Sequence, residues 1–106
     1  MARASVSLSI VEDTVVLTPC DIGGGAGGFH ITGTWTGTIT FEAKAPGAGS
    51  TNWVSILATS VATDVPATTT TGNGIFRVVA DGLHIRARLS TATSGTAVVY
   101  PFEVGL

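Results

Sequence analysis

The longest regular pattern of hydrophobic and polar positions in the chain covers residues 33–44. Its odd positions include Trp35, Ile39 and Phe41, whereas its even positions begin with four threonines and continue with Glu42. Successive side chains of a strand point to opposite faces, so this two-residue period predicts one long strand with a buried face. A helix would mix the large apolar residues with the threonines. We therefore expect the other elements to pack around this strand.

Shorter extended segments occupy most of the remaining chain. Alternation or β-branched residues mark residues 5–10, 14–18, 53–59, 65–71, 75–80, 83–90 and 96–104. Residues typical of turns separate most of these segments, and none shows the period of an amphipathic helix. Parallel strands would need helical crossovers, so the strands must be antiparallel. The sequence predicts an all-β fold: a single antiparallel β-sandwich domain over residues 1–106, jelly-roll or immunoglobulin-like, with about eight short strands.

Six large apolar side chains are expected to form the core between the sheets. They are Trp35, Ile39, Phe41, Ile85, Leu89 and Phe102. Burial of each would contribute about 1.5–3 kcal/mol before the entropy of the chain is subtracted.

Two segments are expected to be loops. Residues 91–95 combine small and polar residues with Gly95, which favours a turn between two strands. Residues 21–28 contain five glycines and are predicted to be a flexible loop, because ordering glycine costs much entropy. The second segment also matches the Gly-x-Gly-x-x-Gly spacing of dinucleotide-binding proteins. That motif requires a helix directly after it, and a strand pattern follows instead, so no nucleotide cofactor is expected.

Composition excludes several classes of partner. Charged residues make up only 11% of the chain and the net charge is −2, and the longest basic cluster is Arg86-x-Arg88. Nucleic-acid binding is therefore not expected. No apolar run approaches the ~18 residues of a membrane span, and Glu12 and Asp13 interrupt the N-terminal apolar positions, so we expect neither a membrane anchor nor a signal peptide. The single Cys20 has no internal partner for a disulfide, which fits synthesis in a reducing cytoplasm.

The sequence contains no recognisable catalytic constellation. His30 and His84 lack the spacing of zinc ligands, and the acidic residues form no pair that marks a glycosidase cleft. Cys20 follows a proline rather than standing at a helix N-terminus that would lower its pKa. We therefore expect no enzyme activity, no catalytic residue, no metal and no cofactor.

Four residues are candidates for an interaction surface. Arg86 and Arg88 lie on the same polar side of one predicted strand, where their like charges repel unless an acid is near. Glu42 on the central strand is one candidate partner, an acid of a neighbouring subunit is another, and a simply solvated face is the third reading. Trp53 is less constrained by its neighbours than Trp35, so it is the candidate for stacking against a sugar.

Three runs of the chain resemble a pattern found in small structural proteins of tailed bacteriophages. The runs are GTWTGTITFEAK, TNWVSI and TGNGIFRVVADGLHIRARLSTATSGTAVVYPF. The resemblance covers roughly residues 31–104, and its motifs are strand and turn signatures that suggest no catalytic residues. It implies a structural component of the virion, namely a capsid decoration protein, a neck or collar piece, or part of a tail or fibre.

The expected partners follow from this resemblance. They are other virion proteins and further copies of the same chain, because such subunits act by binding their neighbours in symmetric arrays. An alternative is a carbohydrate- or receptor-binding module on the virion, whose ligand would be a glycan of the host surface. A third reading is a soluble assembly factor that is absent from mature particles.

Overall fold

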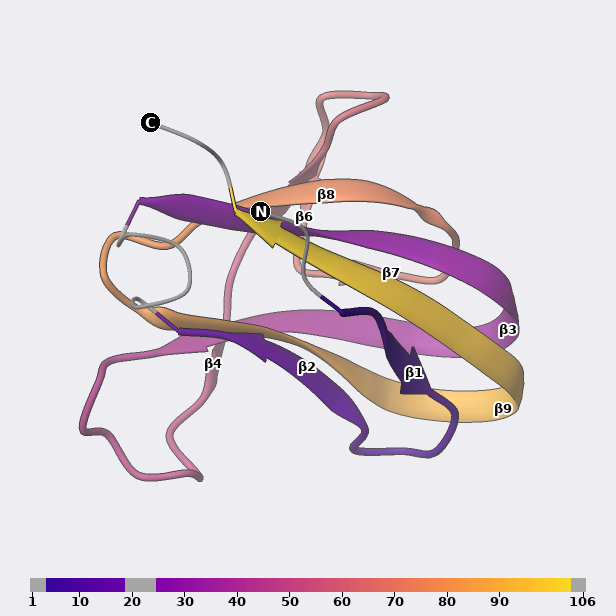
Figure 1. The fold of residues 1–106 in the computed structure, drawn as a ribbon, viewed down its shortest axis with the longest axis horizontal. Coiled ribbons are helices and arrows are strands. Elements are labelled where there is room, and N and C mark those ends of the chain that lie inside the picture. Colours follow the sequence, from indigo (N-terminus) through magenta and orange to yellow (C-terminus); the bar gives the residue numbers. More distant parts are fainter. Residues whose placement is uncertain (1–3, 19–24, 104–106) are drawn as a thin grey trace.

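The computed structural model describes residues 4–18 and 25–103, which form nine strands and no helix (Figure 1). The strands are β1 (Val6–Leu8), β2 (Thr14–Leu17), β3 (Ala26–Lys44), β4 (Val54–Ser55), β5 (Ala58–Ser60), β6 (Pro66–Ala67), β7 (Thr69–Thr70), β8 (Gly74–Val79) and β9 (His84–Glu103). Every pairing between them is antiparallel, which confirms the predicted all-β antiparallel class. Within these two ranges, no helix is long and apolar enough to cross a membrane.

The long strands β3 and β9 pair with each other along almost their whole length. Their ladder runs from Gly27 opposite Glu103 to Lys44 opposite His84. The register shifts twice, so that Ser90 and Thr93 of β9 have no opposite residue in β3. Each extra residue is a β-bulge, which bends the strand and increases its twist.

The two bulges let the paired strands fold back over themselves. The rings of Phe29 and Phe41 belong to the same strand, yet their centroids are only 6.2 Å apart. Twelve residues of straight strand would span roughly 40 Å. The first half of β3 therefore faces its second half, and the same holds for β9, as the curved ribbons in Figure 1 show.

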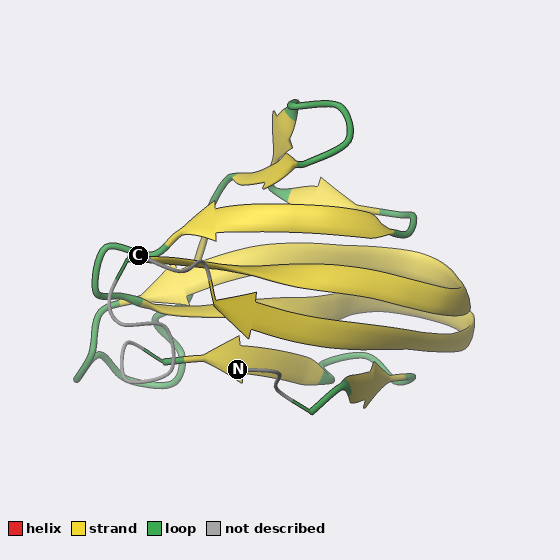
Figure 2. Ribbon diagram, turned by 45° about the horizontal axis from the view of Figure 1, so that its top comes forward, coloured by secondary structure: helices red, strands yellow, loops and turns green. Residues whose placement is uncertain are grey.

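This bend produces two layers from one continuous sheet (Figure 2). In one layer the order is β1-β9-β3-β8-β5-β6, and this layer uses the first half of β3 and the second half of β9. In the other layer β2 pairs with the first half of β9, while β4 and β7 pair with the second half of β3. The predicted count of about eight short strands is wrong in one respect, because two of the nine strands have 19 and 20 residues.

The core lies between the two layers. Of the six residues predicted to form it, Ile39, Phe41, Ile85 and Leu89 are buried. They pack with Phe29, Ile31, Val78, Val99 and Leu17, among others.

The core assignment is wrong for Phe102 and only partly right for Trp35, because both are half-buried and only Trp35 packs against the core. Trp35 lies at the bend, where its indole N–H donates to Oδ1 of Asn73 over 2.7 Å. That polar group needs a partner and keeps the ring near the surface. Phe102 belongs to the outward side of β9, because Ala97 and Val99 of the other side are the buried ones. Its ring lies against Gly28, where any Cβ would collide with it.

Both predicted loops are partly or wholly strand. Residues 91–95 continue β9 through the bend, because each remains paired with β3 or stands at a bulge. Gly95 has a φ of +79° and a Cβ there would collide with the backbone oxygen of Thr34. In the glycine-rich segment, residues 26–28 begin β3 and pair with β8, and residues 27 and 28 also pair with β9. Residues 21–24 and Cys20 lie outside the described residues.

A pair of glycine variants tests whether the close backbone approach at the bend is required. Gly82 has nearly the same φ as Gly95, +81°, but nothing within 4 Å of the position of a Cβ. Both Gly82→Ala and Gly95→Ala should cost about 1 kcal/mol because alanine disfavours positive φ. Gly95→Ala should lose a further ~1–3 kcal/mol through the collision with Thr34. Equal losses in urea unfolding would show that the two strands do not approach closely at this point.

Candidate functional site

A cluster of charged residues lies on the outer face of the layer that contains β2. Glu42 of β3 stands directly opposite Arg86 of β9, and Arg88 is opposite Thr40, two residues away on the same face. Alternation along antiparallel strands therefore brings the three charged side chains together. Arg88 donates from Nε and from a terminal nitrogen to the two oxygens of Glu42, over 3.0 and 3.1 Å. Arg86 donates from Nε to Oε1 of the same carboxylate over 2.8 Å.

Glu42 is almost buried beneath these arginines, with 6% of the residue exposed. Burial opposes ionisation, but the hydrogen bonds from Arg88 and Arg86, together with their positive charges, outweigh it and lower the pKa of Glu42. The hydrogen bond to Glu42 likewise raises the pKa of Arg88. The acid therefore compensates the repulsion between the two arginines, as the first of the three readings of this face predicted.

Trp53 lies over the same cluster although it belongs to the connection between β3 and β4. The guanidinium carbon of Arg86 is 4.1 Å from the centroid of the indole ring, within the range of a cation–π interaction. The ammonium group of Lys44 lies 5.5 Å from the same ring and donates to the carbonyl oxygen of Ala48 over 2.9 Å. The loop after β3 is thus held against the sheet by two cations.

All four residues predicted as an interaction surface therefore belong to one site, and the structure adds two more. Glu12 accepts a hydrogen bond from Arg88 over 3.0 Å and links the turn between β1 and β2 to the cluster. Lys44 could have been found from the sequence, because it follows Glu42 by two positions on the same face. Glu12 could not, since its approach depends on the pairing of β2 with β9.

The chemistry of this cluster suits binding and stabilisation better than proton transfer. An acid whose pKa is lowered by two arginines stays ionised and is a poor general acid or base at neutral pH. Among the described residues the side-chain hydrogen bonds to Glu42 come from Arg86 and Arg88, although Ser55 of β4 stands opposite Glu42 in the ladder. Among residues 4–18 and 25–103, no group of three or more histidines, cysteines or acids could hold a metal ion.

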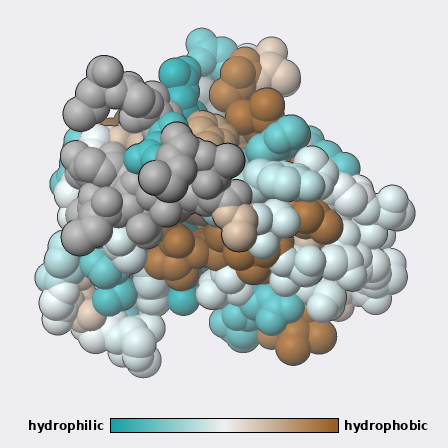
Figure 3. Space-filling model, viewed as in Figure 1, coloured by the Kyte–Doolittle hydropathy of each residue, from teal (hydrophilic) through white to brown (hydrophobic). Residues whose placement is uncertain are grey.

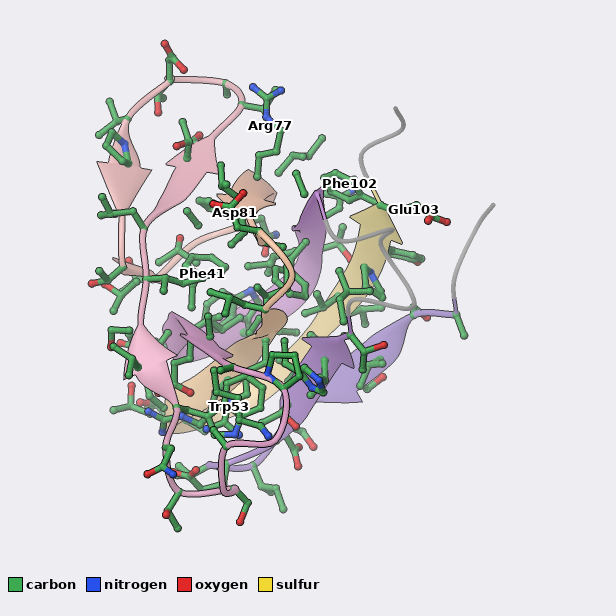
Figure 4. All side chains as sticks on the ribbon, turned by 90° about the vertical axis from the view of Figure 1, so that its left-hand side faces the viewer. Phe41, Trp53, Arg77, Asp81, Phe102 and Glu103 are labelled. Carbon is green, nitrogen blue, oxygen red and sulfur yellow. The ribbon has the colours of Figure 1, made fainter. Side chains whose placement is uncertain are left out.

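A second surface feature lies on the other layer, where a hollow of about 310 Å³ opens beside the paired strands β8 and β5 and the loop after β5. Its lining consists of Ala26, Thr59, Asp64, Arg77, Val78 and Val79. Figure 4 shows Arg77 and Trp53 at opposite ends of the molecule, so the hollow and the charged cluster are separate sites. Sequence reasoning did not single out this hollow, because residues from three strands and a loop line it.

Comparison with known proteins shows the fold but no family. No family model and no curated protein matches the chain. Among solved structures, the chain is similar to the SPBc2 prophage-derived protein YomS, with a TM-score of 0.71 and 12% sequence identity. The match covers 93% of this chain and 92% of that protein, so the two share their overall fold.

The charged cluster predicts a specific dependence of stability on pH. The pKa of Glu42 is lower in the folded state, so its ionisation stabilises the fold at pH values above about 4.3, the ordinary pKa of glutamate. That stabilisation is lost as the pH falls through the folded-state pKa. Glu42→Gln leaves Arg86 without an acid and Arg88 with only the exposed Glu12, and it should cost about 2–4 kcal/mol at pH 7.

Chemical unfolding of the wild type and Glu42→Gln at several pH values measures this effect. The difference between them should shrink steadily in acid, where the wild-type carboxyl is itself protonated. Glu12→Gln is the matched control, because Glu12 is largely exposed and its removal should cost less than about 1 kcal/mol. A difference between wild type and Glu42→Gln that stays constant from pH 7 to acid would contradict the assigned role of the carboxylate.

Proposed function

We propose that this chain is a bacteriophage-associated protein and, more specifically, a non-enzymatic structural component of the virion. The observation that carries the proposal is the likeness of fold, over nearly the whole chain, to a protein that is described as prophage-derived. The sequence resemblance to small structural proteins of tailed phages points in the same direction. The proposed role of the chain is capsid decoration, a position at the neck or collar, or a place in a tail or fibre.

The character of the two candidate sites supports an assembly role over catalysis. In the charged cluster, Glu42, Arg86 and Arg88 satisfy one another, which yields a rigid outer face without a reactive group. The chain also carries few charges for solubility, 11% of its residues. A protein of this composition gains from covering part of its surface with neighbours.

The arrangement around Trp53 gives less support to a carbohydrate-binding module. Sugars stack on exposed faces of aromatic rings, but the guanidinium group of Arg86 already lies over this indole. A glycan would have to use the remaining ring surface or displace the arginine. Contacts with virion proteins and with further copies of the chain therefore remain the proposed mode of action.

Quantitative mass spectrometry of purified particles tests this proposal. Particles filled with DNA would be prepared by density gradient from the phage or induced prophage whose genome encodes the chain. We expect its peptides at many copies per particle, measured against the major capsid protein. A host cytoplasmic protein of similar abundance in the lysate serves as the control for contamination. If the protein is abundant in the lysate but absent from filled particles, the structural role is contradicted and an assembly factor is favoured.

A further inference from the structure

The surface around the hollow has an unusual composition for an exposed face. Strand β8 buries Phe76 and Val78 in the core, so its alternate residues point outward. Two of the outward residues are apolar as well, with Ile75 38% exposed and Val79 69% exposed. A strand that is apolar on both faces is typical of one that is covered on both faces.

A projecting hairpin extends this apolar surface. Residues 58–67, here called the arm, comprise β5, the connecting loop and β6; β5 pairs with β8, and the hairpin projects beyond it (Figures 1 and 2). The arm pairs with β8 through Thr59 opposite Arg77 and Ser60 opposite Phe76, and the N–H of Val61 donates to the oxygen of Ile75 over 2.9 Å. Val61, which continues this register on the same face as Ile75, is 53% exposed. In Figure 3, hydrophobic residues gather at the top of the view, where Figure 1 places the arm.

Two opposite charges complete this surface. Asp64 of the arm and Arg77 of β8 both line the hollow and are both exposed. Neither side chain forms an ion pair or hydrogen bond with the part of the chain that the structure describes. Arg77 extends beyond the sheet beside the arm (Figure 4). An acid and a base are therefore held near each other without neutralising each other.

We infer that this surface, the arm face, binds a second copy of the same chain about a two-fold axis. The arm face consists of Val61, Asp64, Ile75, Arg77 and Val79. In a two-fold dimer every contact between two different residues of the patch occurs twice, once in each direction. Arg77 then pairs with Asp64 of the partner subunit, and Asp64 pairs with Arg77 of the partner subunit.

Charge complementarity is the reason for choosing a second copy as the occupant. The arm face carries one positive and one negative group. A two-fold rotation therefore places the positive group of each copy against the negative group of the other, and apolar residues surround the two ion pairs. The low net charge of −2 offers little long-range repulsion against such self-association. The inference specifies one partner, a second copy of the chain, for the assembly role proposed above, and to that extent it rests on the proposed function.

Reversing the charge of Arg77 or of Asp64 tests whether these two residues pair across a dimer interface. Sedimentation equilibrium over a range of concentrations should show a reversible dimer of the wild type. Arg77→Asp places two acids against each other at both contacts, and Asp64→Arg places two bases there. Each variant should weaken dimerisation by about tenfold or more, because like charges in an interface are strongly unfavourable.

The decisive step is to mix the two variants. A heterodimer of Arg77→Asp with Asp64→Arg regains an opposite-charge pair at both contacts and should form where neither variant dimerises alone. The double variant should also recover self-association. Thr51→Asp, at an exposed position in the loop between β3 and β4, is the control and should dimerise like the wild type. Circular dichroism of each variant checks that the fold is intact.

Three results would overturn the inference. They are a wild type that stays monomeric up to roughly 1 mM, a dimer that both reversals leave unchanged, and a mixture that does not recover association. The first of these would assign the arm face to another kind of partner. None of the three bears on whether the protein is found in phage particles, so this test and the particle analysis fail independently.

Discussion

The continuous pairing of β3 with β9 through their bend is the constraint on which the rest of the structure depends. Both strands would be far too long for a domain of this size if they were straight. The two bulges at Ser90 and Thr93 turn them back together, so that one ladder supplies the middle of both layers. The shorter strands then need only add to its edges, and the core fills the space between the halves of the same two strands.

The same bend separates the two outer faces and gives them different characters. On one layer the carboxylate of Glu42 binds Arg86 and Arg88, and the ring of Trp53 lies against Arg86, so the charges are largely satisfied within the molecule. On the other layer the arm and β8 expose apolar residues together with an acid and a base that have no partner within the described residues. The first face is suited to stability and the second to association.

Much of this could be predicted from alternation, and the failures have identifiable physical causes. The pattern located Ile39 and Phe41 in the core because only one of the two sides of that segment is apolar. Near Phe102 both sides of β9 are apolar, so alternation alone cannot choose between them. The choice is made by β3, whose Ile31 stands opposite Val99. Small and polar residues at 91–95 suggest a loop unless the paired strand is known.

The candidate site was predicted in part for a similar reason. Glu42 and the two arginines follow from alternation on neighbouring strands, whereas Trp53 reaches the cluster from a loop whose course is decided by tertiary contacts. Solution NMR tests the account most directly through the bend itself. Nuclear Overhauser contacts between the rings of Phe29 and Phe41, with slow amide exchange maintained through the β9 bend, are the result that the folded-back ladder predicts. Absence of those contacts, with fast exchange at residues 91–95, would contradict it.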